Sequence, residues 1–440
     1  MKDIQMPRTA LLSFLGAFLF LSPQIAFADS YTEQQMAMIV AKAMEVIRGD
    51  YLFYDASKDA DCRKEIERML KMKIAREQGK ASLEGLKENT CLDKHSEIMT
   101  PRERREMDIH TSGSVVGIGA AIRVSPGPLS VEEVIKGSPA ESAGILSGDI
   151  LLRARNEDDV SFFEFKELQS SLEKIRGAKG SNIYLVIERN GAVIELPPFK
   201  RDVVEVPSVS VKEFEDVGYL SVKHFSERTG DELEAAVIGF FTKGIGRLVL
   251  DLRDNPGGLV TSALKSLYYW NSRLSDVMVT VRYKNGEKVG SVRDPTGQCP
   301  DLENLCLTFV DPKTQTPKGP GGFGGFKVVI LINKGSASAS EIFAGVMKDW
   351  VDIQNKVLLV GGRTLGKGVG QTTSVLPNAF GFSLRRTTFE YLVGNAKVEV
   401  NKIGVFPHYL IDDTRETAED TLTERDQQWR RALAIVREMR

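Results

Sequence analysis

The sequence predicts a multidomain α/β protein, on three observations. At 440 residues the chain is longer than one ordinary domain. Its first part has the apolar spacing of helices, and short, glycine-punctuated strand patterns follow. The remainder alternates apolar strands with helices, as in sheets covered by helices. The 58 basic and 60 acidic residues leave a formal net charge of −2, so we expect no nucleic-acid partner.

The N-terminus has the pattern of an export signal. Lys2 and Arg8 precede the apolar run ALLSFLGAFLFL, and the small residues AFA follow at 26–28. This order predicts a secretory signal peptide over residues 1–28, cleaved after Ala28. An uncleaved membrane anchor is the alternative, but the run is well short of the ~20 residues that a spanning helix needs. We therefore expect a periplasmic mature protein.

The chain has four cysteines, an even number that favours two disulfides in an oxidising compartment. Proximity in the sequence favours Cys62–Cys91 and Cys299–Cys306, although three pairings are possible. Metal binding is the alternative. The chain has no Cys-x2-Cys pair and only four histidines, so we expect no metal site.

Residues 29–112 are expected to be helical. The stretches YTEQQMAMIVAKAMEVI and DCRKEIERMLKMKIAREQ repeat apolar residues at three- and four-residue spacing. A plain helical subdomain is the simplest interpretation. A face for a partner protein, or for homo-oligomerisation through these helices, is the alternative.

Residues 113–203 resemble a PDZ domain. Strand patterns flank the motif GSPAESAGILSGD, whose GSPA, AGI and GD fall where that family places them. The resemblance implies that the loop at Gly117, Ile118 and Gly119 points backbone N–H groups at a peptide's C-terminal carboxylate, while the peptide adds a strand to the sheet edge. Alternatively, these glycines only shape a tight turn.

Residues 204–412 are expected to form an α/β core, followed by a charged helix over 413–440. In the core, the apolar strand VVILI runs into the turn NKGSASASE and then a helix. A helix N-terminus offers free N–H groups and positive potential to an oxyanion. A serine nucleophile needs a base, and His408 is the one histidine in plausible surroundings.

Lys367, in RTLGKGVGQT, is the better candidate for the base. A lysine pKa is normally near 10.4, so burial or nearby positive charge must lower it by ~3 units for work near pH 7. Gln371 lies four residues on, and in an extended segment both side chains share one face, so its amide could orient the lysine. The alternative is an exposed lysine in a glycine hairpin.

Together, NKGSASASEI, GKGVGQ, LDLRDNPGG and the upstream PDZ pattern resemble the C-terminal processing peptidase (tail-specific protease) family. The resemblance implies a ClpP/crotonase-like α/β protease core that hydrolyses peptide bonds with a serine–lysine dyad. It implies no metal and no organic cofactor. The roles it assigns are Ser338 as nucleophile, Lys367 as base, Gln371 as third residue, and the N–H groups of Ala339 and Gly258 as oxyanion donors. The preceding glycine of the NPGG turn is left open as an alternative donor.

The resemblance therefore predicts an exported serine endopeptidase that cleaves proteins near their C-termini, with the PDZ domain selecting the tail. Its partners would be unfolded or tail-exposed proteins, and an activator or adaptor that moves a PDZ domain covering the active site. Two alternatives stay open. One is a catalytically inactive PDZ scaffold or partner-binding protein in the cell envelope. The other is acyl-CoA hydrolysis or hydration on a crotonase-like core.

Overall fold

The protein is described here by a computed structural model. The described residues are 31–77, 91–123, 128–166, 168–268, 270, 277–284, 286–291, 325–354 and 356–439. The predicted signal peptide and the predicted Cys299–Cys306 disulfide lie outside them. Among the helices within these ranges, none is both long and apolar enough to cross a membrane.

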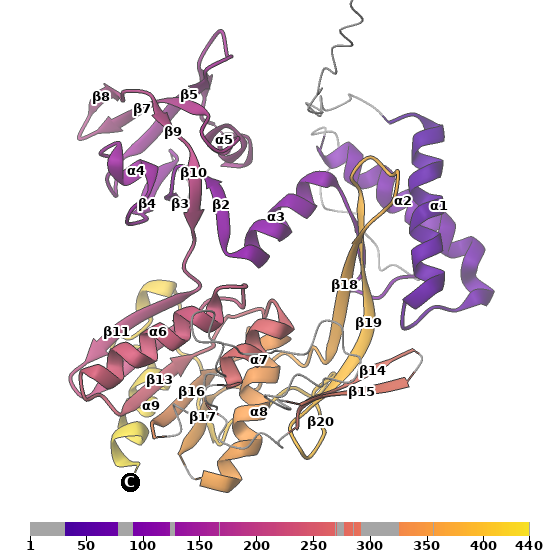
Figure 1. The fold of residues 1–440 in the computed structure, drawn as a ribbon. Helices are drawn as coiled ribbons and strands as arrows, with labels where there is room; N and C mark the ends of the chain where they lie inside the picture. The colour runs from indigo at the N-terminus through magenta and orange to yellow at the C-terminus, as the bar shows by residue number, and fades with distance from the viewer. Residues whose placement is uncertain are drawn as a thin grey trace, which may run out of the picture.

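The predicted fold class is confirmed: a helical N-terminal region, a small β-rich domain and a mixed α/β core follow one another along the chain (Figure 1). The N-terminal region contains α1 (Glu33–Asp50), α2 (Asp59–Glu77) and α3 (Pro101–Ser112), with the short helix η1 (Ala56–Lys58) between the first two. Capping boxes begin two of these helices: Thr32 caps α1 and Thr100 caps α3. Each threonine hydroxyl binds a backbone N–H that the helix itself leaves unpaired.

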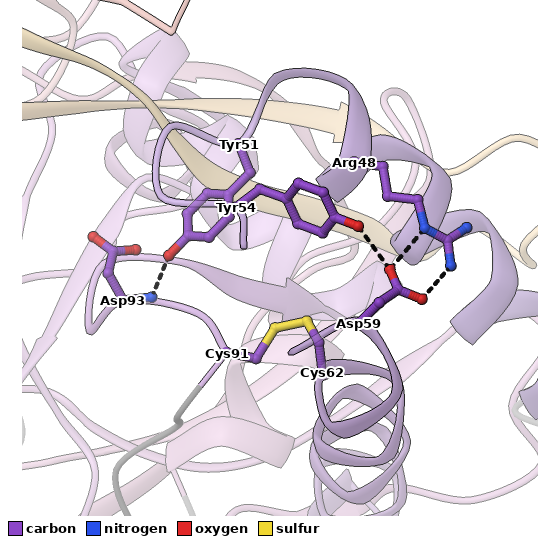
Figure 2. The surroundings of a disulfide bond; sticks show 7 residues. All are labelled: Arg48, Tyr51, Tyr54, Asp59, Cys62, Cys91 and Asp93. Carbon is purple, nitrogen blue, oxygen red and sulfur yellow. Dashed lines mark hydrogen bonds and ion pairs between the residues drawn. A yellow bond between two sulfur atoms is a disulfide. The ribbon is translucent and has the colours of Figure 1, made fainter. Parts of the chain in front are cut away.

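The predicted Cys62–Cys91 disulfide is present and crosslinks two parts of the N-terminal region. It joins α2 to the segment that precedes β1 (Glu97–Met99), across a sequence separation of 29 residues. Beside it, Tyr51 Oη accepts a hydrogen bond from the N–H of Asp93 at 2.7 Å (Figure 2). The segment after Cys91 is therefore fixed to both α2 and the end of α1.

The β-rich domain (residues 118–200) follows α3. Its sheet has the strand order β3 (Ala120–Arg123), β4 (Ser130–Val134), β5 (Ile150–Asn156), β7 (Asn182–Arg189) and β8 (Ala192–Glu195), with β6 (Phe163–Glu164) on β5 and β9 (Phe199–Lys200) on β7. Two helices accompany it, α4 (Pro139–Ser142) and α5 (Leu168–Ile175). Asp149 of the GD motif is buried and forms an ion pair with Arg189 at 2.6 Å.

A two-stranded stem connects this domain to the rest of the chain. It consists of β2 (Ser114–Gly117) paired antiparallel with β10 (Asp202–Glu205). One strand of the stem continues from α3, and the other leads into the core (Figure 1). The aromatic rings of His110 on α3 and His224 in the core stack with their centroids 4.2 Å apart.

The main sheet of the core lies between two layers of helices. Its strand order is β11 (Val209–Phe214), β12 (Val217–Val222), β13 (Arg247–Asp251), β16 (Lys327–Ile332), β17 (Val357–Gly361) and β21 (Tyr409–Leu410). Alternate residues of its strands pack against α6 (Thr229–Thr242), α7 (Val260–Tyr268) and α8 (Ala339–Gln354), and the others against α9 (Gln427–Glu438). This alternation explains the unbroken apolar runs of these strands.

The C-terminal helix is shorter than the predicted span of 413–440. It begins at Gln427, where the Asp426 side chain accepts the Trp429 N–H at 3.0 Å and so caps the helix. The preceding segment forms turns and the short helix η2 (Ala418–Asp420) instead. The charged composition of the segment gave no sign of where the cap would fall.

A second sheet is built around the long strand β19 (Ser383–Val393). This strand pairs with β1, β14 (Val277–Tyr283), β18 (Val369–Val375) and β20 (Val398–Glu399), while β15 (Gly286–Ser291) pairs with β14. The hairpin of β18 and β19 reaches from the core to α1 and α2 (Figure 1). Its apolar end packs among the buried side chains of the two helices through Leu376, Phe382 and Leu384.

Replacing both disulfide cysteines, Cys62→Ser/Cys91→Ser, should destabilise the N-terminal region. A crosslink spanning about 30 residues removes roughly 3–4 kcal/mol of chain entropy from the unfolded state, so the free energy of unfolding should fall by about that amount. Urea unfolding followed by far-UV circular dichroism measures the difference. Equal unfolding midpoints for the variant and the wild type would show that the disulfide adds no stability.

Candidate active site

Three serines lie between the end of β16 and the first turn of α8, and two of their hydroxyls hold this segment in place. Ser336 Oγ donates to the carbonyl of Leu252 at 2.7 Å, and Ser340 Oγ donates to the carbonyl of Asn255 at 3.0 Å. In the part of the chain that the structure describes, the Ser338 hydroxyl makes no hydrogen bond. The middle serine is therefore the one whose oxygen is available for chemistry.

Ser338 lies directly before α8 in an unusual backbone conformation. Its φ is +56°, in the left-handed region that non-glycine residues rarely adopt. Its carbonyl accepts the first-turn N–H groups of Glu341 and Ile342, at 2.8 and 3.0 Å. Strained residues of this kind persist where the surroundings hold them, often at functional sites. Here the side chain is left with only 8% of its surface exposed, at the positive end of α8.

The carboxylate of Glu341 joins this turn to the loop that carries Lys367. Glu341 has no exposed surface. Its Oε2 accepts the backbone N–H groups of Ser338 and Lys367, each at 2.8 Å. Its Oε1 accepts the N–H of Gly366 at 2.6 Å and the hydroxyl of Thr364 at 2.5 Å. The predicted nucleophile and the predicted base are thus held by one side chain, to which sequence reasoning assigned no role.

Tyr391, on β19, makes a second connection between the same two residues. Its hydroxyl shares its one proton between the carbonyl of Ser338, at 3.2 Å, and the carbonyl of Lys367. The side chain is fully buried, and burial raises the pKa of Tyr391 well above its ordinary value. The hydroxyl therefore keeps its proton and remains a donor. Nothing in the sequence around Tyr391 indicated this position.

Lys367 is partly buried, at the end of the loop before β18. Burial is the main cause that lowers its pKa to about 8, and the nearby charge of Arg385 acts in the same direction, while Asp93 and Glu341 oppose the shift. Within the described residues, the Lys367 ammonium makes no hydrogen bond or ion pair, and none joins it to Ser338. A lysine with a lowered pKa is neutral more often near pH 7 than an exposed lysine.

Gln371 lies on β18, where a bulge separates it from Gly370. Its Nε2 donates to Thr387 Oγ1 at 3.3 Å and to the carbonyl of Val369 at 3.5 Å. In the described part of the chain no hydrogen bond joins this amide to Lys367. The structure therefore attaches Gln371 to β19 instead of to the lysine that we expected it to orient.

The NPGG turn lies against the serine turn. A Cβ added to Gly257 would be 2.8 Å from Ser338 Cβ and 2.9 Å from the nitrogen of Ala339. The Gly257 N–H donates to Asn255 Oδ1 at 2.9 Å, so it is already used. Among the described residues, the N–H groups of Ala339 and Gly258 have no acceptor, which suits the predicted role of these two as oxyanion donors.

Two histidines, His408 and His95, have defined surroundings in the structure. His408 Nδ1 accepts the Leu359 N–H at 2.9 Å, so this nitrogen serves the edge of the main sheet. His95, whose surroundings indicated no function, lies within the electrostatic reach of Lys367: burial lowers the pKa of His95, and the charge of Lys367 lowers it further. The described residues contain no group of three or more His, Cys, Asp or Glu that could hold a metal ion.

The predicted peptide-binding loop lies at the start of the β-rich domain. Gly117 ends the stem, and the Ile118 side chain is buried in the core of the domain. Gly119 has a φ of +83°, and an added Cβ would come within 2.3 Å of Ser138 Cβ. Only a glycine fits this position. The loop leads directly into β3, which in the described part of the chain pairs with β4 alone.

Comparison with known proteins identifies the core. Residues 216–411 match the model of peptidase family S41, a range that includes every residue of the predicted catalytic site. A "Probable CtpA-like serine protease" of Staphylococcus saprophyticus is 31% identical over 337 residues, which cover 77% of this chain and 61% of that protein. The chain spans 61% of the length of this relative and 50% of the length of a second one, from Staphylococcus epidermidis.

Two solved structures are also similar. The photosystem II D1 C-terminal processing protease is 22% identical, with a TM-score of 0.45, over 89% of this chain and 96% of that chain. A PDZ domain of a carboxy-terminal protease from Vibrio cholerae, in complex with peptide, is 21% identical, with a TM-score of 0.20, over 21% of this chain and 99% of that chain. On the family model and the curated relatives, this chain carries a peptidase family S41 domain and is a homologue of the CtpA-like serine proteases.

Proposed function

We propose that this chain is an exported serine endopeptidase that cleaves proteins near their C-termini, with Ser338 as nucleophile and Lys367 as general base. The observation that carries the proposal is the shared Glu341 carboxylate, which holds the backbone of both residues in one unit. The pKa of Lys367, lowered to about 8, leaves ~10% of the side chain neutral at pH 7. Proximity and a usable base are what a serine hydroxyl needs to react.

The reaction follows from these positions. Neutral Lys367 takes the proton of Ser338 Oγ as this oxygen attacks the peptide carbonyl carbon. The N–H groups of Ala339 and Gly258, with the positive end of α8, stabilise the oxyanion. The C–N bond then breaks, the leaving amine takes the proton from Lys367, and an ester remains on Ser338. Water, deprotonated by Lys367, hydrolyses that ester and restores the serine.

The resting protein is latent in this proposal. Proton transfer needs Ser338 Oγ and Lys367 Nζ within about 2.6–3.2 Å of one another, and in the described residues no hydrogen bond joins them. Because Glu341 fixes only the two backbones, the lysine side chain is free to complete the dyad when a substrate or an activator protein binds.

The β-rich domain selects the tail. The free edge of β3 can accept an extended peptide as an additional strand. In the described part of the chain, the N–H groups of Ile118 and Gly119, directly before that edge, have no acceptor. A C-terminal carboxylate placed there would receive both. This geometry supports selection of proteins by their C-termini, as in a PDZ domain.

The activity and its pH dependence can be tested together. Ser338→Ala and Lys367→Ala should each lower hydrolysis of a denatured, tail-bearing protein by at least about 10³-fold, because the dyad acts as a unit. Wild-type activity should rise with pH and reach half its maximum near pH 8, the pKa of Lys367. A protonated lysine cannot accept the serine proton, so activity is lost as pH falls below that value.

The measurement is the rate of substrate cleavage between pH 5.5 and roughly 9.5, with and without candidate activator proteins. The same rate for Ser338→Ala and wild type would remove the enzyme assignment and favour the inactive scaffold. Hydrolysis of acyl-CoA thioesters without peptide cleavage would favour the crotonase-type alternative.

Glu341→Gln should inactivate the protein more than it destabilises it. An amide nitrogen cannot accept hydrogen bonds, so two of the four donors around this side chain lose their acceptor, at about 1–3 kcal/mol each in stability. A displacement of about 1 Å between serine and lysine costs roughly 10²-fold in rate. Cleavage rate and urea unfolding, measured on this variant and on the exposed control Glu424→Gln, separate the two effects. Full activity in Glu341→Gln would show that the shared carboxylate does not position the dyad.

Tail selection predicts a dependence on the free carboxylate. A peptide ending in a carboxylate should bind the wild type at least about 10-fold more tightly than the same peptide ending in an amide, because a buried polar site left unpaired costs more than 1 kcal/mol. Gly119→Ala should abolish the difference, since its Cβ would meet Ser138. Fluorescence anisotropy measures both affinities. The control is Gly239→Ala, where an added Cβ meets nothing within 4 Å; equal affinity for both peptides in the wild type would contradict the model.

A further inference from the structure

The segment between the disulfide and β1, residues 91–96, comes from the N-terminal region and contacts β19. Cys91 ties it to α2, and the Asp93 N–H donates to Tyr51 Oη at 2.7 Å (Figure 2). Immediately after it, β1 pairs with β19, so that Glu97 lies opposite Arg385. The segment is thus held by a covalent bond at one end and by a sheet at the other.

The Asp93 side chain points its carboxylate at β19. Its Oδ2 accepts the Thr387 hydroxyl at 2.8 Å, and its Oδ1 accepts the Ser96 hydroxyl. Ser96 Oγ also accepts the backbone N–H of Thr387 at 2.9 Å, and the Leu52 N–H donates to the Thr387 carbonyl at 3.0 Å. Thr387 has no exposed surface, so its hydroxyl proton is committed to Asp93.

This commitment determines how Thr387 meets Gln371. A hydroxyl that donates its single proton to a carboxylate can act toward a second partner only as an acceptor. Thr387 Oγ1 accordingly accepts Gln371 Nε2 at 3.3 Å. The carboxylate therefore specifies which end of the Gln371 amide faces β19, and the oxygen end faces away. Asp93, Thr387 and Gln371 form one directed relay from the N-terminal region to the predicted catalytic residues.

The same carboxylate contributes to the charge around Lys367. The charged groups that face this lysine come from three elements: Arg385 on β19, Glu341 on α8, and Asp93 with the titratable His95 in the segment 91–96. Arg385 lowers the pKa of Lys367, whereas Asp93 and Glu341 raise it. Glu341 belongs to the core, whereas Asp93 is the acidic group that the N-terminal region contributes.

We propose that Asp93 is a positioning residue of the active site: through Thr387 it orients the amide of Gln371, and its negative charge acts on Lys367. The proposal rests on the proposed function of Ser338 and Lys367. It assigns to the disulfide-anchored segment 91–96 a part in catalysis. The N-terminal region then completes the active site of the core instead of serving only as a support.

Variants of two residues test the relay and the charge separately. Thr387→Val removes the hydroxyl and keeps the shape and the Asp93 charge, whereas Thr387→Ser keeps the hydroxyl. Asp93→Asn removes the charge. The control is Asp59→Asn, a carboxylate of the same helical region that binds Arg48 and Tyr54 on the other side of the disulfide (Figure 2). Rates of peptide cleavage and of labelling by a fluorophosphonate probe are measured on the full chain against pH.

Thr387→Val should slow labelling and cleavage roughly 10- to 100-fold, as expected for a misplaced group near the reacting atoms, without moving the acid limb of the pH profile. Thr387→Ser should recover most of the rate. Asp93→Asn should slow the reaction and also move the acid limb to lower pH, because a charge that raises the lysine pKa has been removed. Asp59→Asn should match the wild type in both respects.

The outcomes separate this proposal from the one on which it rests. If the wild type shows no Ser338-dependent labelling or cleavage at any pH, with or without activator, the serine–lysine function itself fails. If the wild type reacts and Asp93→Asn has the wild-type rate and profile, Asp93 has no part in the site. A slower Asp93→Asn with an unmoved acid limb, and a Thr387→Ser no better than Thr387→Val, would reduce both residues to structural roles.

Discussion

The buried carboxylate of Glu341 is the constraint on which the site depends. A carboxylate without solvent contact is costly unless donors surround it, and this one receives three backbone N–H groups and a hydroxyl. Those donors come from two separate segments, the serine turn and the loop before β18. Neither segment is regular secondary structure, so neither would hold its position alone. The energetic need to satisfy one charge therefore fixes the relative position of Ser338 and Lys367.

Strand β19 extends this constraint to the rest of the molecule. Arg385, Thr387 and Tyr391 of β19 all act toward the site. Between the first two, Arg386 binds Asp50 at the end of α1. A single strand thus contacts the nucleophile turn, the lysine loop and the N-terminal helices, and its displacement would disturb all of them together.

The catalytic residues that could be predicted from the sequence are those that lie within short, recognisable motifs. Ser338 and Lys367 stand in short glycine- and alanine-rich motifs, where a small neighbour has an obvious purpose. Even so, the choice among the three serines depended on the family resemblance. The structure adds a physical reason, because the hydroxyls of Ser336 and Ser340 are already used in hydrogen bonds to backbone carbonyls. Glu341 was inside a quoted motif, but no pattern shows that its side chain turns back to bind backbone N–H groups. Tyr391 was missed because it lies 53 residues beyond Ser338 in an ordinary strand.

The charge at Lys367 shows why such distant contributions matter. Arg385 lowers the lysine pKa, and Arg385 itself binds Glu97, which also binds the buried Lys73 of α2 at 2.8 Å. Lys73 in turn binds Glu103 at 2.8 Å on α3, the helix that leads into the stem of the β-rich domain. In an interior of low dielectric these ion pairs influence one another. The surroundings of Arg385 therefore include ion pairs with the N-terminal region. A core separated from that region would keep Ser338, Lys367 and Arg385 but lose Asp93 and the Glu97 partner of Arg385.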